Sequence, residues 1–196
     1  NSASSAPQLL ALAAFYLSTE NGNEVKRLAE AAIKLEENSA AAYQMLGMAH
    51  RLNFDLEASS SAFAKALELD SESLSGRRNL ADMKRAIGKS EEAIALYSEV
   101  LAKDPDDLPS QTGRILSLFE GGKRSEAESE LLKSVEANSG NVVLLAGAAW
   151  WYAPHGETAK AIDLAGKGIA SEPRYIWSHI ALARAFTSAG RFAAAE

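Results

Sequence analysis

Apolar and small residues recur along this chain at one fixed spacing. The clearest series advances by 34 residues with no insertion or deletion, through Ala13, Gly47, Ala81, Ile115, Ala149 and Ala183. Five of these six residues are alanine or glycine, whose side chains are no larger than a methyl group. A period of this length is typical of a repeat protein whose unit is a pair of helices. The sequence therefore predicts an all-α protein built from stacked helix pairs.

The period divides the chain into repeats if Ala6 is taken as position 1 of the first repeat. Residues 1–5 are then predicted to be a disordered tail or a cloning remnant, and residues 6–196 a single array. The predicted repeats span 6–39, 40–73, 74–107, 108–141, 142–175 and a truncated 176–196.

Each repeat carries two amphipathic helical patterns. Apolar residues at positions 4, 7, 8 and 11 share one face of a first helix, and those at positions 20, 24, 27 and 28 share one face of a second. Pro105 and Pro173 stand at position 32, where they are expected just past the second helix. Glycine at position 15 is expected to end the first helix in a left-handed conformation. It is found in the last four repeats, as Gly88, Gly122, Gly156 and Gly190.

Two stretches carry a more specific motif. They are Tyr43-x-x-Leu46-Gly47…Ala58…Phe63-x-x-Ala66 and Gly88-x-x-x-Glu92-Ala93-x-x-x-Tyr97…Asp104-Pro105. These residues resemble tetratricopeptide repeats, and the same frame extends over residues 6–196. The resemblance implies a right-handed superhelical solenoid of antiparallel helix pairs, with five full repeats and part of a sixth. It also implies that the first helix of each pair lines the concave side.

One face of each first helix points away from the core of its own repeat, and it contains positions 2, 5, 9, 12 and 13. Toward the C-terminus this face is apolar and aromatic, and in the second and third repeats it is rich in arginine. An apolar face with aromatic anchors is a candidate binding surface, and arginine can bind carboxylates. The sequence therefore predicts a peptide-binding groove formed by Met48, Arg51, Arg78, Asp82, Arg85, Leu116, Phe119, Trp150, Trp177, Ile180 and Arg184.

Two other interpretations of this face stay open. Tight superhelical winding could bury these side chains against neighbouring first helices, or a further C-terminal part could cover them. The last repeat stops shortly after Gly190 without the polar capping helix that such arrays need. We therefore expect the chain to be a fragment of a longer protein, or a partner to cover Phe186 and Phe192.

A specific ligand known for the family is not expected. Members that bind chaperone tails hold the terminal carboxylate with Lys and Asn at positions 5 and 9 of one repeat. They add Asn at position 6 of the next repeat and Lys and Arg at positions 2 and 6 of the one after. Only Asn79 of this chain matches that set.

The composition excludes several function classes. The formal net charge of −6 gives no overall attraction for phosphate backbones, so no nucleic acid partner is expected. No uninterrupted apolar stretch approaches 18 residues, so no membrane insertion is expected. The absence of cysteine removes thiol chemistry but leaves cytoplasm and periplasm equally open. The alanine-rich, regular repeats look bacterial.

No catalytic, cofactor or metal constellation is found. Gly88-Lys89-Ser90 has the ending of a phosphate-binding loop, but Met83 stands where the first glycine is required. No two of the three histidines have the i, i+4 spacing of a helical metal site. We therefore expect no enzyme activity, no cofactor and no metal.

The predicted function is a protein–protein interaction scaffold that binds a peptide or partner domain in the concave groove. Two alternatives remain. The array could be the regulatory or targeting arm of a larger enzyme. It could also be a structural protein that assembles into homo-oligomers through its exposed tryptophans or its uncovered end.

Overall fold

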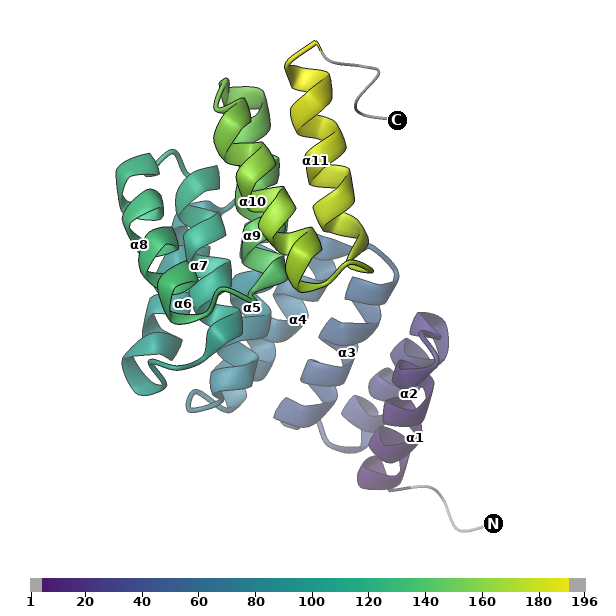
Figure 1. Ribbon diagram of the computed structural model, residues 1–196. Helices are drawn as coiled ribbons and strands as arrows, with labels where there is room; N and C mark the ends of the chain where they lie inside the picture. Colours follow the sequence, from purple (N-terminus) through teal and green to yellow (C-terminus); the bar gives the residue numbers. More distant parts are fainter. Residues whose placement is uncertain (1–4, 191–196) are drawn as a thin grey trace. The chain divides into compact units, whose positions relative to one another are not determined.

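The computed structural model describes residues 5–190, which form eleven α-helices and one 3-10 turn and contain no strand (Figure 1). The first helices of the pairs are α1 (Ala6–Ser18), α3 (Ala40–Leu52), α5 (Leu74–Ala86), α7 (Leu108–Glu120), α9 (Val142–Tyr152) and α11 (Ile176–Ser188). The second helices are α2 (Gly22–Leu35), α4 (Leu56–Leu69), α6 (Ser90–Lys103), α8 (Arg124–Ala137) and α10 (Thr158–Ser171), and the turn η1 (Ala153–His155) follows α9. Both series start at intervals of 34 residues, so the predicted helix pairs are confirmed.

The helices belong to two compact units, each described by itself. The N-terminal unit, Asn1–Pro105, contains α1 to α6, and the C-terminal unit, Asp106–Glu196, contains α7 to α11. One continuous array over 6–196 stays a prediction. Phe192, named above as a residue to be covered by a partner, lies outside the described residues, as do residues 1–4 of the predicted tail.

Helices begin where polar side chains can satisfy the free N–H groups of the first turn. The side chains of Ser39, Ser73, Asp107 and Asn141 accept from the N–H three residues on, at the starts of α3, α5, α7 and α9. Such caps stabilise a helix by about 1 kcal/mol each. The first helices therefore start at the same point of each of these four repeats.

Small residues let the two helices of a repeat approach closely. Phe63 is fully buried, and its ring lies so near Gly47 that a Cβ atom there would come within 2.6 Å of it. In the third repeat, Ala81 and Ala93 pack with Tyr97 in the same way. The series of small residues at 34-residue intervals is thus the contact line between helices.

Some core-facing positions carry charged residues, and their charges are paired within the repeat. The acidic partners all lie on the second helix, so each ion pair also ties the two helices together. The pairs are Arg77–Glu99 (2.8 Å), Lys84–Glu92 (2.7 Å) and Arg114–Glu130 (2.7 Å).

The turn after each first helix is left-handed at position 15. The four glycines predicted to end these helices have φ between 70° and 79°, which confirms that expectation. In the first two repeats the same conformation is held by Glu20, with φ of 56°, and by Phe54, with φ of 58°. The Phe54 side chain is 88% exposed, so it gains little packing in return for this strained backbone.

We predict that Phe54→Gly raises the free energy of unfolding by about 1 kcal/mol, because glycine has no Cβ to clash in the left-handed region. The matched control is Gly88→Phe, at the equivalent turn with φ of 76° and open space around it. That change should lower stability by a similar amount. Denaturant unfolding measures both. A Phe54→Gly protein no more stable than the parent would contradict the role given to this turn.

Candidate functional site

The predicted groove residues of the N-terminal unit gather on α3 and α5 around one carboxylate. Asp82 is half-buried and accepts a hydrogen bond from the Tyr97 hydroxyl. Burial raises the pKa of the Asp82 carboxyl, against the opposing effects of that hydrogen bond and of the charges of Arg85, Arg51 and Arg78. We call Arg51, Arg78, Arg85 and Asp82 the arginine cluster. Its three guanidiniums and one carboxylate leave a net positive charge on this face.

Met48, predicted to line the groove, packs mainly between repeats. It is half-buried and packs against the core cluster of Phe63, Leu80 and Met83. Its thioether therefore belongs largely to the packing between repeats and offers little surface to a ligand.

Leu116 and Phe119 are buried, with 8% and 1% of their surface exposed. Leu116 packs so close to Gly147 that a Cβ there would lie 2.6 Å from its methyl carbon. The ring centroid of Phe119 lies 4.7 Å from that of Trp151 and 5.4 Å from that of Tyr152. The expectation that Leu116 and Phe119 line an open groove is therefore wrong. Stacking of α7 directly on α9 covers them, which is the burial alternative considered above.

The remaining predicted groove residues form an exposed surface on α9 and α11. Trp150, Trp177 and Ile180 are 43%, 57% and 37% exposed. On α11, Trp177, Ile180 and Arg184 have the i, i+3, i+7 spacing of one helical face. The Arg184 guanidinium carbon lies 3.7 Å from the centroid of the Trp150 ring, which joins the two helices across this surface. We call Trp150, Trp177, Ile180 and Arg184, together with the half-exposed Val143, the aromatic face.

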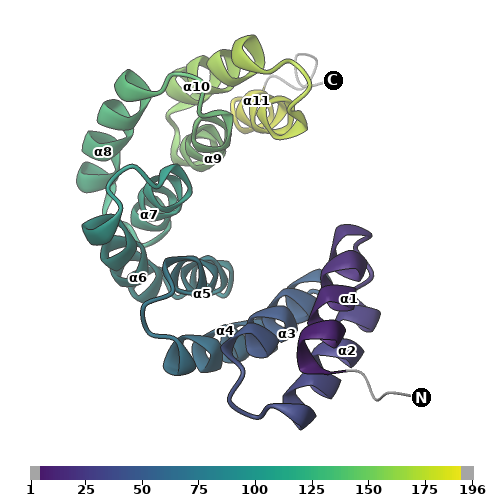
Figure 2. The same ribbon diagram turned by 90° about the horizontal axis from the view of Figure 1, so that it is seen from below.

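The aromatic face lies on the side of the C-terminal unit that its first helices form. Figure 2 shows α7, α9 and α11 on one side of this unit and α8 and α10 on the other. Helix α9 packs against both α7 and α11. The α7 side chains are thereby covered, whereas the outer residues of α9 and α11 remain open.

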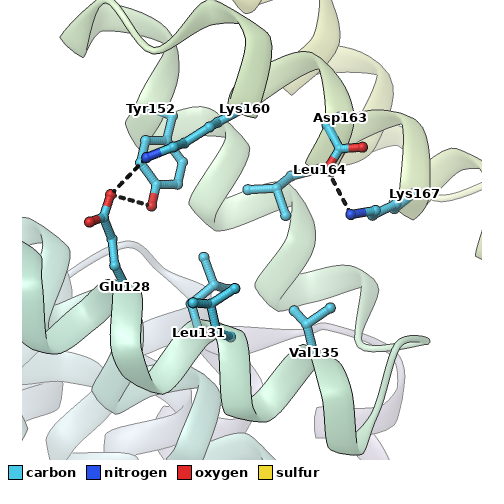
Figure 3. A pocket seen from close by; sticks show the side chains of 9 residues that line it. Glu128, Leu131, Val135, Tyr152, Lys160, Asp163, Leu164 and Lys167 are labelled. Carbon is cyan, nitrogen blue, oxygen red and sulfur yellow. Dashed lines mark hydrogen bonds and ion pairs between the residues drawn. The ribbon is translucent and has the colours of Figure 1, made fainter.

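A pocket of about 290 Å³ lies between α8 and α10 of the same unit (Figure 3). Leu131, Val135 and Leu164 supply its apolar lining. This pocket was not predicted from the sequence, because Leu131 and Val135 stand at positions 24 and 28, which predict core packing. In the described part of the unit, α8 packs against α7 and little against α10, so these side chains border a gap.

The rim of the pocket is polar, and its charges pair with one another. Glu128 accepts hydrogen bonds from the Tyr152 hydroxyl (2.9 Å) and from Lys160 (3.2 Å), and Lys167 pairs with Asp163 (2.7 Å). The hydrogen bond from Tyr152 is the main cause that lowers the pKa of the Glu128 carboxyl, against burial. Burial and the same bond raise the pKa of Tyr152. The network thus ties α8 to α9 and α10 at one end of the pocket.

We predict that Glu128→Gln lowers the free energy of unfolding at neutral pH by roughly 0.5–1 kcal/mol, because a partly exposed ion pair is worth little more. The folded-state pKa of Glu128 lies below its ordinary value of 4.5. The stabilisation is therefore present above the ordinary pKa and lost as the pH falls through the lowered one. Parent and variant should converge in acid, as followed by thermal unfolding across pH.

The control for this measurement is Glu136→Gln, an exposed glutamate on the same helix. It should change stability little at any pH. A Glu128→Gln protein that is destabilised equally in acid and at neutral pH would contradict the account, because its loss would then be one of packing and not of charge.

Residues 5–190 contain no group of three or more His, Asp or Glu side chains that could hold a metal ion. Within the same range, every helix is too short or too polar to cross a lipid bilayer.

Comparison with known proteins supports the fold assignment. Residues 40–73 match the family model described as tetratricopeptide repeat. No curated protein sequence matches the chain. Residues 40–73 are thus a tetratricopeptide repeat, and the described helix pairs share the fold of the solved structures that follow.

Solved structures with a similar fold include the following three. PilW, a widely conserved type IV pilus biogenesis factor, aligns with a TM-score of 0.79 and 16% identity over 97% of this chain and 88% of that one. A tetratricopeptide repeat protein from Parabacteroides merdae aligns with a TM-score of 0.75 and 19% identity over 97% and 75%. YrrB, a tetratricopeptide repeat protein with an unusual peptide-binding site, aligns with a TM-score of 0.69 and 18% identity over 89% and 90%. At these identities the likeness concerns the fold.

Proposed function

We propose that this protein is a non-catalytic scaffold that binds a peptide or a partner domain on the aromatic face of α9 and α11. The observation that carries the proposal is the exposure of Trp150 on α9 and of Trp177 and Ile180 on the face of α11 whose Arg184 contacts Trp150. Contiguous exposed apolar surface is characteristic of interaction sites, and tryptophan is among the commonest binding anchors.

The fold supports the same function. Stacked helix pairs present an extended surface that their own core does not use, and proteins of this architecture bind others on it. YrrB, which shares the fold, has a peptide-binding site. The arginine cluster of the N-terminal unit is proposed as a separate contact region for acidic groups, because arginine forms paired hydrogen bonds with carboxylates.

Two alternatives would use the same residues differently. A second copy of this chain could occupy the aromatic face, which would make the protein a self-assembling one. The array could also serve as the targeting arm of a larger enzyme, in which case the face would still bind a protein. Only self-assembly changes what the aromatic face contacts. The mass of the protein in solution tests it, because a self-assembling protein is an oligomer.

We predict that replacing Trp150 and Trp177 together by alanine removes binding and leaves folding nearly intact, since both side chains are substantially exposed. A peptide selected from a randomised displayed library on the parent protein should lose at least about tenfold in affinity, the scale of one anchor residue. Fluorescence polarisation measures this loss, and the melting temperature measures folding.

The control is Phe54→Ala, which removes an exposed aromatic side chain of the N-terminal unit that is not part of the aromatic face. It should leave peptide affinity unchanged. If no peptide is enriched, or if the double variant binds the selected peptide like the parent, the proposed site is wrong. If light scattering shows an oligomer that the double variant dissociates, the occupant is a second copy.

A further inference from the structure

We infer that the partner segment bound by the aromatic face carries a carboxylate close to an apolar side chain, and that Arg184 receives this carboxylate. The inference rests on the proposed function and specifies the chemistry of the partner. It follows from the charges on α9 and α11, from the position of Arg184 and from the spacing of side chains along α11.

The aromatic face has a single permanent charge. Helix α9 has the sequence VVLLAGAAWWY and contains no acidic or basic residue. Helix α11, IWSHIALARAFTS, contains only His179 and Arg184. The ring of His179 contacts the carbonyl oxygen of Pro173 at 2.8 Å and is thereby held at the preceding loop. Arg184 is thus a lone cation in an otherwise apolar surface.

Two other arginines of this unit show what Arg184 lacks. Arg114 pairs with Glu130 at 2.7 Å, and Arg124 pairs with Glu157 and Glu128. Among residues 5–190, Arg184 has its cation–π contact with Trp150 and makes no ion pair with a carboxylate. Its charge is therefore satisfied by the ring and by solvent, and no acid of the described unit neutralises it.

The stacked geometry leaves the guanidinium able to bind an anion. The Arg184 guanidinium carbon lies 3.7 Å over the centre of the Trp150 ring, so the ring covers the planar group from one side. The N–H donors of a guanidinium lie in its plane, so a ring on one side leaves donors for another partner. A carboxylate can accept two of these N–H groups at once. The tryptophan ring also fixes the guanidinium in place, so less conformational freedom is lost when the anion binds.

Binding of a purely apolar partner would be costly here. Covering Trp177 and Ile180 removes water from the adjacent guanidinium, and a buried charge without a partner is strongly unfavourable. A partner carboxylate offsets this cost and adds charge-assisted hydrogen bonds. The apolar residues provide the anchoring surface, and the arginine selects among apolar partners those that carry an acid.

The spacing on α11 sets the pattern of the partner. Ile180 and Trp177 precede Arg184 by four and seven residues, which corresponds to roughly 6 and 10 Å along a helix. An extended peptide covers about 3.3 Å per residue. We therefore expect an Asp or Glu about two or three residues from an aromatic or aliphatic side chain, or a C-terminal carboxylate at the same separation.

The test is selection of a randomised displayed peptide library on the parent protein, followed by polarisation binding to variants. Arg184→Gln removes the charge and keeps a planar polar side chain. Arg174→Gln, an exposed arginine just before α11, removes the same charge away from Trp150 and serves as the control. Peptides should be enriched in an acid at the stated separation. Their affinity should fall at least about tenfold for Arg184→Gln and little for Arg174→Gln.

A double-mutant cycle assigns the contact. Replacing the acidic residue of the peptide, for example Glu by Gln, should weaken binding to the parent protein by the same factor as Arg184→Gln does. The same peptide change should weaken binding to the Arg184→Gln protein little further, because the two changes remove the same interaction. Selected peptides without an acid, or with equal affinity for Arg184→Gln, would overturn the inference. If such peptides still lost affinity when Trp150 and Trp177 were replaced, the proposed function would stand. If these peptides kept their affinity for that double variant, or if no peptide were enriched, the inference and the proposed function would both fail.

Discussion

Close approach of the two helices in each repeat, through residues with little or no side chain, is the contact on which the rest of the structure depends. The ring of Phe63 occupies the space that a side chain at Gly47 would fill, and Tyr97 packs against Ala81 and Ala93. Leu116 makes the same kind of contact between neighbouring first helices, where it lies against Gly147. These contacts occupy one side of each helix. Where no neighbouring first helix covers the opposite side, as at Trp177, interaction residues can stand there at little cost to folding.

Periodicity predicts the parts of the fold that depend on one repeat alone. Helix starts follow from polar caps and apolar spacing, and the left-handed turns follow from glycine at position 15. The left-handed conformation of Phe54 cannot be predicted from its residue type, since the surrounding helix pair imposes it and the Phe54 Cβ opposes it. Leu116 and Phe119 could not be placed from a helical wheel, because their burial depends on Gly147, Trp151 and other residues one repeat away. The pocket beside Leu131 escaped prediction for the same reason.

The binding chemistry that we propose for these surfaces rests on local charge, although the chain as a whole is acidic. Where arginines face the core side of a repeat, glutamates of the second helix neutralise them, as for Arg77 and Arg114. In the arginine cluster, Asp82 and the Tyr97 hydroxyl supply an internal partner. Arg184 has instead an aromatic ring and exposed apolar neighbours, so it can discriminate among partners. Exposed apolar area would then provide affinity, and the single cation would provide selectivity.

Quenching of tryptophan fluorescence tests the central claim most directly, in three variants that each retain one of Trp150, Trp151 and Trp177 and carry phenylalanine at the other two positions. Trp151 is stacked on His155 with ring centroids 4.0 Å apart and also contacts Phe119, whereas Trp177 is 57% exposed. In a monomer, acrylamide should quench Trp177 most and Trp151 least, and iodide should reach Trp150 readily because the Arg184 cation attracts it. Equal shielding of all three tryptophans in a monomeric protein would contradict the existence of an open aromatic face.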